Sequence, residues 1–313
     1  INYTMQEMAE NAVLTHMPRL QKEFFEQNET LADSIAPFRE LTSGAVDTLL
    51  RISMRRSERW RKMKYDLKKD NEEIEESFFA PKEMTVFSWE GEIDTIMTPL
   101  DSMKYYKSFF RPGMMSMDPT NGYIKAWVGG MNYRHFQYDM VKKGKRQIGS
   151  TFKPFVYAAA IDQLKLSPCD TFPDSQFCIE KNKFGNVEQW CPKNSGDKYG
   201  RTRTLKNALA NSVNTVTARL MDRIGPRTVV KLAKDLGIEQ RILPVPSIAL
   251  GTPDLSVYEM VAAYSTFANK GVYTQPVFIE RIEDKNGTTL YENKPLTRDV
   301  LSEEAAYVTV NLL

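Results

Sequence analysis

Residues 149–161 read GSTFKPFVYAAAI, and this run decides how the rest of the chain is interpreted. From Phe155 to Ile161 it has almost no polar face, and a helix that is apolar all round is usually buried. Pro154 is tolerated only in the first turn of a helix, so the helix is expected to begin near Ser150. The sequence therefore predicts a buried helix whose first turn carries Ser150 and Lys153.

Ser150 and Lys153 stand three residues apart, a spacing that places both side chains on one face of a helix. A serine hydroxyl becomes a good nucleophile only when a base removes its proton. Apolar surroundings disfavour the ammonium form of lysine, so Lys153 is expected to act as that base. The alternative is a serine helix cap followed by a surface lysine. A second Ser-x-x-Lys, at 195–198, lies in a coil-like stretch, so context and not spacing favours Ser150.

A second motif, Ser212-Val213-Asn214, is the only Ser-x-Asn in the chain and lies between two predicted helices. A loop there can present a hydroxyl that relays a proton and a carboxamide that binds a peptide bond. The alternative is an Asn that ends one helix and a Thr that caps the next. Because the two motifs together are much rarer than either alone, we predict four catalytic residues: Ser150, Lys153, Ser212 and Asn214.

The apolar periodicity predicts helices in the middle of the chain with hairpins on either side. Residues 3–26 are expected to form a short strand or coil leading into a helix. Residues 131–149 and 166–203 are expected to be loops, the second with short strands. The other expected elements are a hairpin over 113–129, helices over 205–210, 215–224, 226–237 and 254–269, a second hairpin over 272–293, and a helix from 302. This order favours an α+β fold.

The stretch 31–95 differs from the rest of the chain in its charge pattern. A basic run, Arg51–Lys69, is followed by an acidic run, Asp70–Glu76. Opposite charges three and four residues apart support an exposed helix. The alternative is a binding patch for an anionic surface.

Composition excludes several classes of function. With 42 basic and 40 acidic residues, the net charge of +2 is too balanced to indicate a nucleic-acid partner. No apolar run reaches the about 18 residues of a membrane-spanning helix, so any anchor or export signal is expected outside this chain. The two histidines, His16 and His135, could not build a His-rich metal site. We expect no metal and no cofactor.

The three cysteines, Cys169, Cys178 and Cys191, fall in one short stretch. A polar Asn/Gly turn separates Cys178 from Cys191, so two strands of a small hairpin could bring them together. A disulfide there would imply an oxidising compartment, and three unconnected thiols are the alternative. The chain has no Cys-x-x-Cys pair, which argues against zinc.

Taken together, several segments resemble the transpeptidase domain of class A, bifunctional, penicillin-binding proteins. The likeness is good over 113–313, fair over the first 25 residues and poor over 31–95, where it is greatest to versions from the Bacteroidetes group. The segments that carry it are 1–13, 126–130, 145–157, 204–215, 246–251, 263–271 and the pattern Trp190-x-Pro192-x-Asn194.

The resemblance implies an α+β fold of the penicillin-binding and serine β-lactamase type, with an antiparallel sheet, helices on both its faces and a helical subdomain. It implies three parts: a leading segment over 1–30, a variable, charged and mostly helical insert over 31–112, and the transpeptidase domain over 113–313. The implied site lies on the periplasmic side of the bacterial inner membrane, with the anchor outside this chain.

The implied reaction is D,D-transpeptidation of peptidoglycan stem peptides. Ser150 would attack the carbonyl between two terminal D-alanines, with Lys153 as base, Ser212 as proton relay, and Asn214 contacting Lys153 and the substrate amide. An amine of a neighbouring stem would accept the acyl group. β-Lactams would acylate Ser150, and cell-wall synthesis proteins would be partners.

The sequence departs from the family pattern in one important respect. The family carries Lys-[Thr/Ser]-Gly on an edge strand, and these 313 residues contain neither form. The strand would supply one oxyanion-hole amide, and losing such a donor costs about 100- to 1,000-fold in rate. We therefore expect the chain to be a fragment that is inactive or nearly so, lacking also an upstream glycosyltransferase domain.

Two other functions compete with the transpeptidase. One is a β-lactam sensor or β-lactamase of the same fold, although the Glu-x-x-Leu-Asn run of class A β-lactamases does not occur in the chain. The other is a non-catalytic cell-wall scaffold that binds partners through the charged region 45–77.

Overall fold

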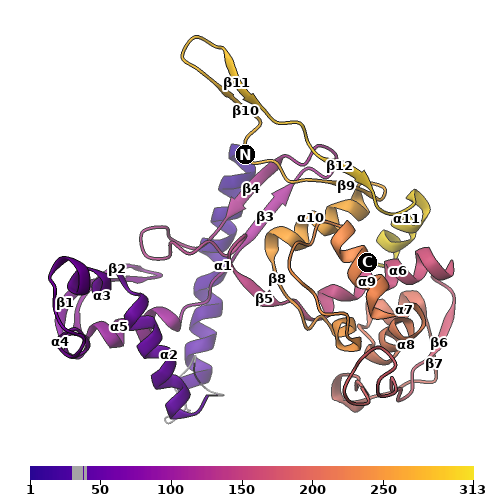
Figure 1. The fold of residues 1–313 in the computed structure, drawn as a ribbon, viewed down its shortest axis with the longest axis horizontal. Helices are drawn as coiled ribbons and strands as arrows, with labels where there is room; N and C mark the ends of the chain where they lie inside the picture. The colour runs from indigo at the N-terminus through magenta and orange to yellow at the C-terminus, as the bar shows by residue number, and fades with distance from the viewer. Residues whose placement is uncertain (30–37, 39–40) are drawn as a thin grey trace. The chain divides into compact units, whose positions relative to one another are not determined.

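A computed structural model describes residues 1–29, 38 and 41–313 of the chain (Figure 1). The contacts divide these residues into two compact units, which are described separately. Unit 1 comprises Ile1–Ala9, Gly113–Gly129 and Tyr138–Leu313. Unit 2 comprises Glu10–Pro112 and Gly130–Gln137.

The core of unit 1 is built around helix α6, Lys153–Leu164. Every residue from Phe152 to Ile161 is buried, which confirms the predicted buried helix. The helix packs against α8, Asn214–Ile224, α9, Pro226–Asp235, and α11, Glu303–Leu312 (Figure 1).

The start of this helix differs from the prediction in its geometry. A 3₁₀ turn, η2, spans Gly149–Phe152, and the α-helix itself begins at Lys153. Pro154 is the second residue of α6, a position at which its missing N–H costs no helical hydrogen bond.

Short antiparallel strand pairs surround these helices in unit 1. The predicted hairpin at 113–129 is confirmed, because β3, Met114–Met117, pairs with β4, Ile124–Val128. Loop residues 166–203 contain short strands as predicted. The other elements are β6, Thr171–Pro173, paired with β7, Thr202–Thr204, and η3, Ser195–Asp197, α7, Leu205–Ala210, and η4, Pro246–Leu250.

Two expectations in unit 1 are wrong in detail. Residues 254–269 are not one helix: β8, Asp254–Ser256, precedes α10, Val257–Ala268. The side chain of Ser256 accepts from Glu259 N–H, and the Glu259 side chain accepts in return from Ser256 N–H, a capping box that starts the helix at Val257. β8 pairs with β5, Lys145–Gln147, a strand inside the predicted loop 131–149.

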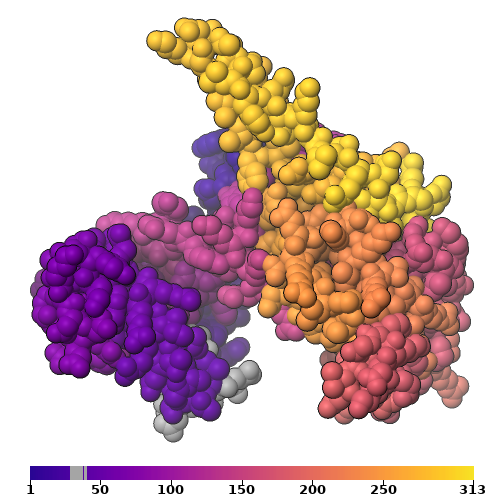
Figure 2. Space-filling model, in the orientation of Figure 1, coloured from indigo at the N-terminus to yellow at the C-terminus, as the bar shows by residue number. Residues whose placement is uncertain are grey.

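The predicted hairpin over 272–293 is present only in its second part. β10, Arg281–Glu283, pairs with β11, Thr289–Glu292, and all their residues are exposed. This hairpin projects as an orange-to-yellow arm from unit 1 (Figure 2). The first part, β9, Val272–Thr274, pairs instead with β12, Thr297–Asp299.

The N-terminal expectation is also wrong. Helix α1 runs without interruption from Tyr3 to Glu29, with no strand or coil before it beyond two residues. The Asn2 carboxamide accepts a hydrogen bond of 3.0 Å from Met5 N–H and so caps the first turn. The apolar residues of α1 recur at mixed spacing, so the sequence gives only a weak helical pattern for this segment.

Most of residues 43–76 in unit 2 are helical, in several short helices, as predicted for the charged stretch, but unit 2 also contains a hairpin that was not predicted. β1, Lys82–Ser88, pairs with β2, Gly91–Met97. For residues 31–37, 39 and 40 the helical prediction lies outside the described residues. The helices are α2, Ser43–Arg56, α3, Glu58–Arg61, the π-turn η1, Lys62–Asp66, α4, Asn71–Glu76, and α5, Pro99–Lys107.

An aromatic cluster forms part of the core of unit 2. Phe87 of β1 packs against Phe109 and Phe136 with ring centroids 5.5 and 5.1 Å apart. His135 lies beside this cluster, with Nδ1 2.9 Å from the Tyr106 hydroxyl. Within the residues described, none of the helices is long and apolar enough to cross a bilayer.

Candidate active site

The segment that carries Ser150 is held by backbone contacts within unit 1. Gly149 N–H donates to the Gly251 carbonyl at 2.9 Å, and the Tyr264 hydroxyl donates to the Thr151 carbonyl at 2.7 Å. Lys153 N–H donates to the Ser150 carbonyl and joins the 3₁₀ turn to α6. Ser150 itself is exposed, so its side chain is open to an incoming substrate.

Gly251 permits the contact with Gly149 because it has no side chain. Its φ of +75° favours glycine, and a Cβ added there would collide with the backbone of Gly149. Gly149, the residue before Ser150, is thus held against Gly251. Any other amino acid at position 251 would displace the Gly149 backbone. In the sequence, Gly251 is notable only as part of a segment that resembles the family, and no local pattern there indicates a function for it.

Lys153 is almost fully buried, with 1% of its surface exposed. Its Nζ lies 2.6 Å from the Ser212 carbonyl oxygen, 2.9 Å from Ser212 Oγ and 2.6 Å from Asn214 Oδ1. The structure thus joins three of the four predicted residues by hydrogen bonds. Ser150 lies one turn before Lys153 on the same helical segment.

Burial lowers the pKa of Lys153 from its ordinary value of 10.5 to about 8. The cause is desolvation, which penalises the charged form of the amine. At pH 7 about one such amine in ten is neutral, whereas an exposed lysine is almost wholly charged. A base that is neutral in this proportion can accept a proton from a hydroxyl near neutral pH.

The three oxygens around Nζ determine how the amine is used. As an ammonium group Lys153 has three N–H donors, one for each oxygen. The Ser212 carbonyl and Asn214 Oδ1 can only accept, so in the neutral form the two remaining N–H groups go to them. The lone pair is then left for a serine hydroxyl. The arrangement therefore provides a proton acceptor at this point.

The loop between α7 and α8 presents Ser212 in a strained conformation. Ser212 has φ +52°, in the left-handed region that non-glycine residues rarely adopt. Its N–H donates to the Leu209 carbonyl at 2.8 Å, and the residue is exposed. Such strain persists only where the surroundings impose it and is frequent at functional sites.

Helix α8 begins at Asn214 but has no cap from its own sequence, because Val213 has no polar side chain. The cap comes from a distant segment: Asn194 Oδ1 accepts from the N–H groups of Asn214 and Thr215 at 3.0 and 3.1 Å. The Asn214 carboxamide also donates through Nδ2 to the Lys193 carbonyl at 2.7 Å. In the sequence, Asn194 is notable only as part of the pattern Trp190-x-Pro192-x-Asn194.

Asp174 is a fully buried carboxylate that holds Asn194 in place. Burial by itself raises the pKa of Asp174, but hydrogen bonds to the carboxylate, that from Arg203 the strongest, outweigh burial and hold the pKa below its ordinary value. Its hydrogen-bond donors are Asn194 Nδ2 at 2.7 Å, Thr215 Oγ1 at 2.9 Å, Gly200 N at 2.9 Å and Arg203 Nε at 2.6 Å.

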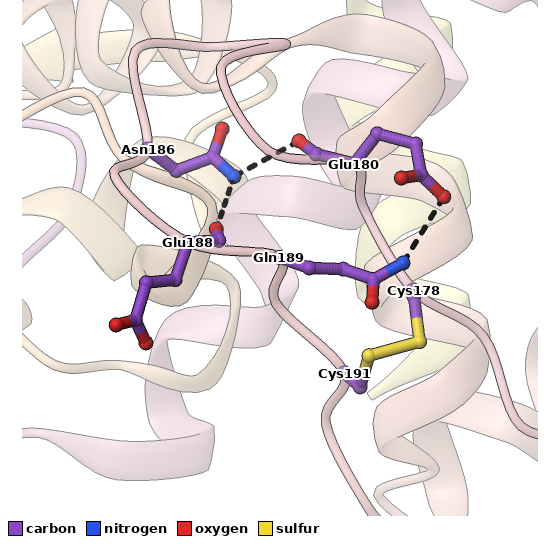
Figure 3. The surroundings of a disulfide bond; sticks show 6 residues. All are labelled: Cys178, Glu180, Asn186, Glu188, Gln189 and Cys191. Carbon is purple, nitrogen blue, oxygen red and sulfur yellow. Dashed lines mark hydrogen bonds between the residues drawn. A yellow bond between two sulfur atoms is a disulfide. The ribbon is translucent and has the colours of Figure 1, made fainter.

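A small hairpin closed by a disulfide leads into Lys193. Cys178 and Cys191 are joined through their sulfur atoms (Figure 3). Between them, Ile179 and Trp190 exchange two backbone hydrogen bonds of 2.9 Å. Cys169 is free and exposed. The disulfide thus fixes the chain two residues before the carbonyl that binds Asn214.

The second Ser-x-x-Lys has none of these features. Ser195 lies in the three-residue turn η3, and both it and Lys198 are exposed. In the part of the chain that the structure describes, no group of three or more His, Cys, Asp or Glu side chains is placed to hold a metal ion.

Comparison with protein families gives two matches along the chain. The model described as penicillin binding protein transpeptidase domain matches residues 113–313. The model described as penicillin-binding protein middle domain matches residues 33–110. The first match includes every residue of the site described above.

The curated relatives point in the same direction. Penicillin-binding protein 1A of Aquifex aeolicus is 36% identical over 202 residues, which are 64% of this chain and 27% of the relative. Penicillin-binding protein 2D of Bacillus subtilis is also 36% identical over 202 residues, 64% of this chain and 29% of the relative. This chain therefore spans under a third of the length of these relatives.

Among solved structures, penicillin-binding protein 1A from Haemophilus influenzae is similar with a TM-score of 0.59 and 27% sequence identity. The likeness covers 64% of this chain and 34% of that one.

Proposed function

The chain belongs to the penicillin-binding protein transpeptidase family, and on that premise we propose that it is the acyl-transfer part of a peptidoglycan D,D-transpeptidase. The observation that carries the proposal is the environment of Lys153. Its buried amine, with a pKa lowered to about 8, contacts Ser212 and Asn214 and lies one turn after Ser150. A serine with an adjacent desolvated amine is the arrangement that acyl transfer requires.

In the proposed reaction, neutral Lys153 takes the proton of the Ser150 hydroxyl as Oγ attacks the carbonyl between two terminal D-alanines. The tetrahedral intermediate collapses, and the C–N bond breaks. Ser212 passes a proton from Lys153 to the nitrogen of the departing D-alanine, which restores the neutral amine. An ester between Ser150 and the stem peptide remains.

The second half of the reaction reverses these roles. The amine of a neighbouring stem peptide attacks the ester carbonyl and gives up one proton through Ser212 to Lys153. The C–O bond to Ser150 breaks as Lys153 returns a proton to Oγ. An amide crosslink forms, and the enzyme regains its starting protonation state.

The proposal extends to partners and location. The donor is a stem peptide ending in D-Ala-D-Ala, the acceptor is an amine of another stem, and β-lactams acylate Ser150. We place the protein at the periplasmic side of the inner membrane, among cell-wall synthesis proteins, with its anchor and a glycosyltransferase domain outside these residues. An origin in the Bacteroidetes group also stays a prediction.

The polypeptide of 313 residues is proposed to be slow by itself. It contains no Lys-Thr-Gly or Lys-Ser-Gly, the motif whose strand provides an oxyanion donor in this family. Without that donor, acyl transfer is expected to fall by about 100- to 1,000-fold relative to the full-length protein. Turnover of a D-Ala-D-Ala peptide by residues 1–313 at the full-length rate would contradict this part.

The central test is acylation of the full-length protein by a fluorescent penicillin, with the adduct located by mass spectrometry. We expect one adduct on Ser150, none in Ser150→Ala, and an unchanged adduct in the matched control Ser195→Ala. Crosslinking of stem peptides should be lost only in Ser150→Ala. If Ser150→Ala keeps the cellular function of the protein, a non-catalytic scaffold is the better explanation.

The lifetime of the adduct separates the transpeptidase from a β-lactamase. A transpeptidase keeps the penicilloyl ester for many minutes, because no general base is positioned to activate a water against it. A β-lactamase releases it within seconds. Rapid loss of the adduct with turnover of penicillin would replace the proposed function by hydrolysis.

A further inference from the structure

The Lys193–Asn194 segment contacts Asn214 twice, and we propose that it is the positioning element of the site, with Asn194 as its key side chain. It would fix the direction of the Asn214 carboxamide and the first turn of α8, so that Lys153 meets an acceptor. The inference rests on the proposed function and deepens it, since Asn194 acts on the reaction only through Asn214.

A carboxamide can present either its oxygen or its nitrogen to a neighbour, and only one choice suits Lys153. The Lys193 carbonyl can only accept, so it selects Nδ2 of Asn214 as its partner at 2.7 Å. This leaves Oδ1 to face Lys153 Nζ at 2.6 Å. The reversed carboxamide would point its N–H groups at the Lys153 ammonium group and leave its oxygen facing the Lys193 carbonyl oxygen.

Asn194 fixes the backbone from which Asn214 projects. Its Oδ1 accepts from two consecutive N–H groups, those of Asn214 and Thr215. These are among the first N–H groups of α8, which have no partner within the helix. Because Val213 offers no side-chain cap, Asn194 caps the helix from about 20 residues away in sequence.

The Asn194 side chain is itself held from two sides. Its Nδ2 donates to buried Asp174 at 2.7 Å and to the Lys198 carbonyl at 3.0 Å. Asp174 has no exposed surface and accepts from four donors, so it has no freedom to follow a displaced Asn194. On the other side, the disulfide through Cys191 anchors the chain just before Lys193.

Loss of the Asn194 side chain therefore has a specific consequence for Lys153. Without its cap the first turn of α8 can move away, and water can reach the amine. Burial is what lowers the pKa of Lys153, so access of water raises that pKa toward 10.5. The neutral fraction near pH 7 then falls, and acylation needs a higher pH.

The test measures the rate of acylation of the full-length protein by a fluorescent penicillin between about pH 5.5 and 9.5. In general-base catalysis this pH profile reports the pKa of the base. In Asn194→Ala we expect a loss at pH 7 of about ten- to a hundredfold, the range for a misplaced catalytic group. The acid limb of the profile should move upward by about half a pH unit or more.

Asn186→Ala is the matched control. Asn186 lies in the disulfide-closed hairpin that precedes Asn194, and its Nδ2 donates to the carbonyls of Glu180 and Glu188 at 3.0 and 2.7 Å (Figure 3). The Asn186 side chain makes three hydrogen bonds, against four for that of Asn194, and none of its three is to Asn214. We expect the wild-type pH profile from Asn186→Ala.

A double variant tests the direction of the Asn194–Asp174 hydrogen bond. Asp174→Asn with Asn194→Asp restores one donor and one acceptor across the 2.7 Å contact and keeps an oxygen to cap α8. It leaves the carboxylate at position 194 facing the Lys198 carbonyl oxygen, so it should regain only part of the rate that Asn194→Ala loses. Should Asn194→Ala not fold, Asn194→Ser is measured in its place, and a smaller shift in the same direction is expected.

Two outcomes would overturn the inference. One is an Asn194 variant, folded by thermal denaturation, with an unchanged pH profile. The other is an equal shift in Asn186→Ala, which would indicate general loosening of the hairpin. Both are distinct from failure of the proposed function, in which the wild-type protein forms no adduct on Ser150 at all.

Discussion

Lys153 Nζ and Asn214 Oδ1 lie 2.6 Å apart, although 61 positions separate the two residues in sequence. Lys153 opens α6 and Asn214 opens α8, so the contact exists only because the two helices pack together in the core. The same packing buries the amine and lowers its pKa. Packing and chemistry are therefore linked at this pair.

Lys153→Met removes the amine but keeps a flexible apolar side chain of similar length. Because the proposed base is lost, the rate of penicillin acylation of the full-length protein should fall by about 100- to 10,000-fold. Lys198→Met, in the exposed second Ser-x-x-Lys, should leave the rate unchanged. An equal loss in both variants would contradict the assignment of Lys153 as base.

The pKa of Lys153 sets the pH dependence of acylation. The active form is the neutral amine, and with a pKa of about 8 it is protonated over most of the acid range. The acylation rate should therefore rise about tenfold per pH unit below this pKa and level off above it. Rates measured with a neutral β-lactam in constant ionic strength check this. A profile that levels off below pH 7 would mean that another group is the base.

The predicted α+β fold class is confirmed, and the buried helix at its centre could be predicted from the run Phe152 to Ile161. A helix without a polar face can be stable only in a core, so this pattern is unambiguous without a structure. The partitions of 1–30, 31–112 and 113–313 stay predictions. The hairpin β1–β2 was not predicted. Its residues follow a strongly charged stretch with helical spacing, and the prediction for 31–95 rested on that charge pattern.

The site was only partly accessible from sequence for a different reason. Two short motifs predicted four site residues, because their spacing and chemistry can be recognised in the sequence: Ser150, Lys153, Ser212 and Asn214. Their catalytic roles stay predictions. Gly251 and Asn194 act through backbone contacts across the fold, with Gly149 and α8 respectively. No local pattern in the sequence signals a contact of that kind.

Gly251→Ala tests whether this close approach positions the nucleophile. The added Cβ would collide with the backbone of Gly149, so the Ser150 segment must shift. A displacement of this kind can cost about a hundredfold in rate, and we expect that loss in penicillin acylation.

Gly287→Ala is the control for backbone strain alone. Gly287 has φ +82°, close to the +75° of Gly251, but its Cβ would meet nothing within 4 Å. Gly287→Ala should therefore cost about 1 to 2 kcal/mol of stability from the left-handed conformation and leave acylation unchanged. If Gly251→Ala were as mild as Gly287→Ala, the contact with Gly149 would have no function.

Replacing both disulfide cysteines, Cys178→Ser with Cys191→Ser, should affect stability and acylation together. The disulfide closes a loop with a sequence separation of 13, and opening such a loop costs about 3 kcal/mol through the entropy of the unfolded chain. Thermal denaturation of the full-length protein should show a lower midpoint for the transition of unit 1. Acylation should also slow, because Lys193 lies two residues beyond Cys191 and its carbonyl binds Asn214. Cys169→Ser, at the free and exposed cysteine, should change neither quantity. A double variant with a lower midpoint but a wild-type acylation rate would show that the hairpin stabilises the fold without reaching Asn214.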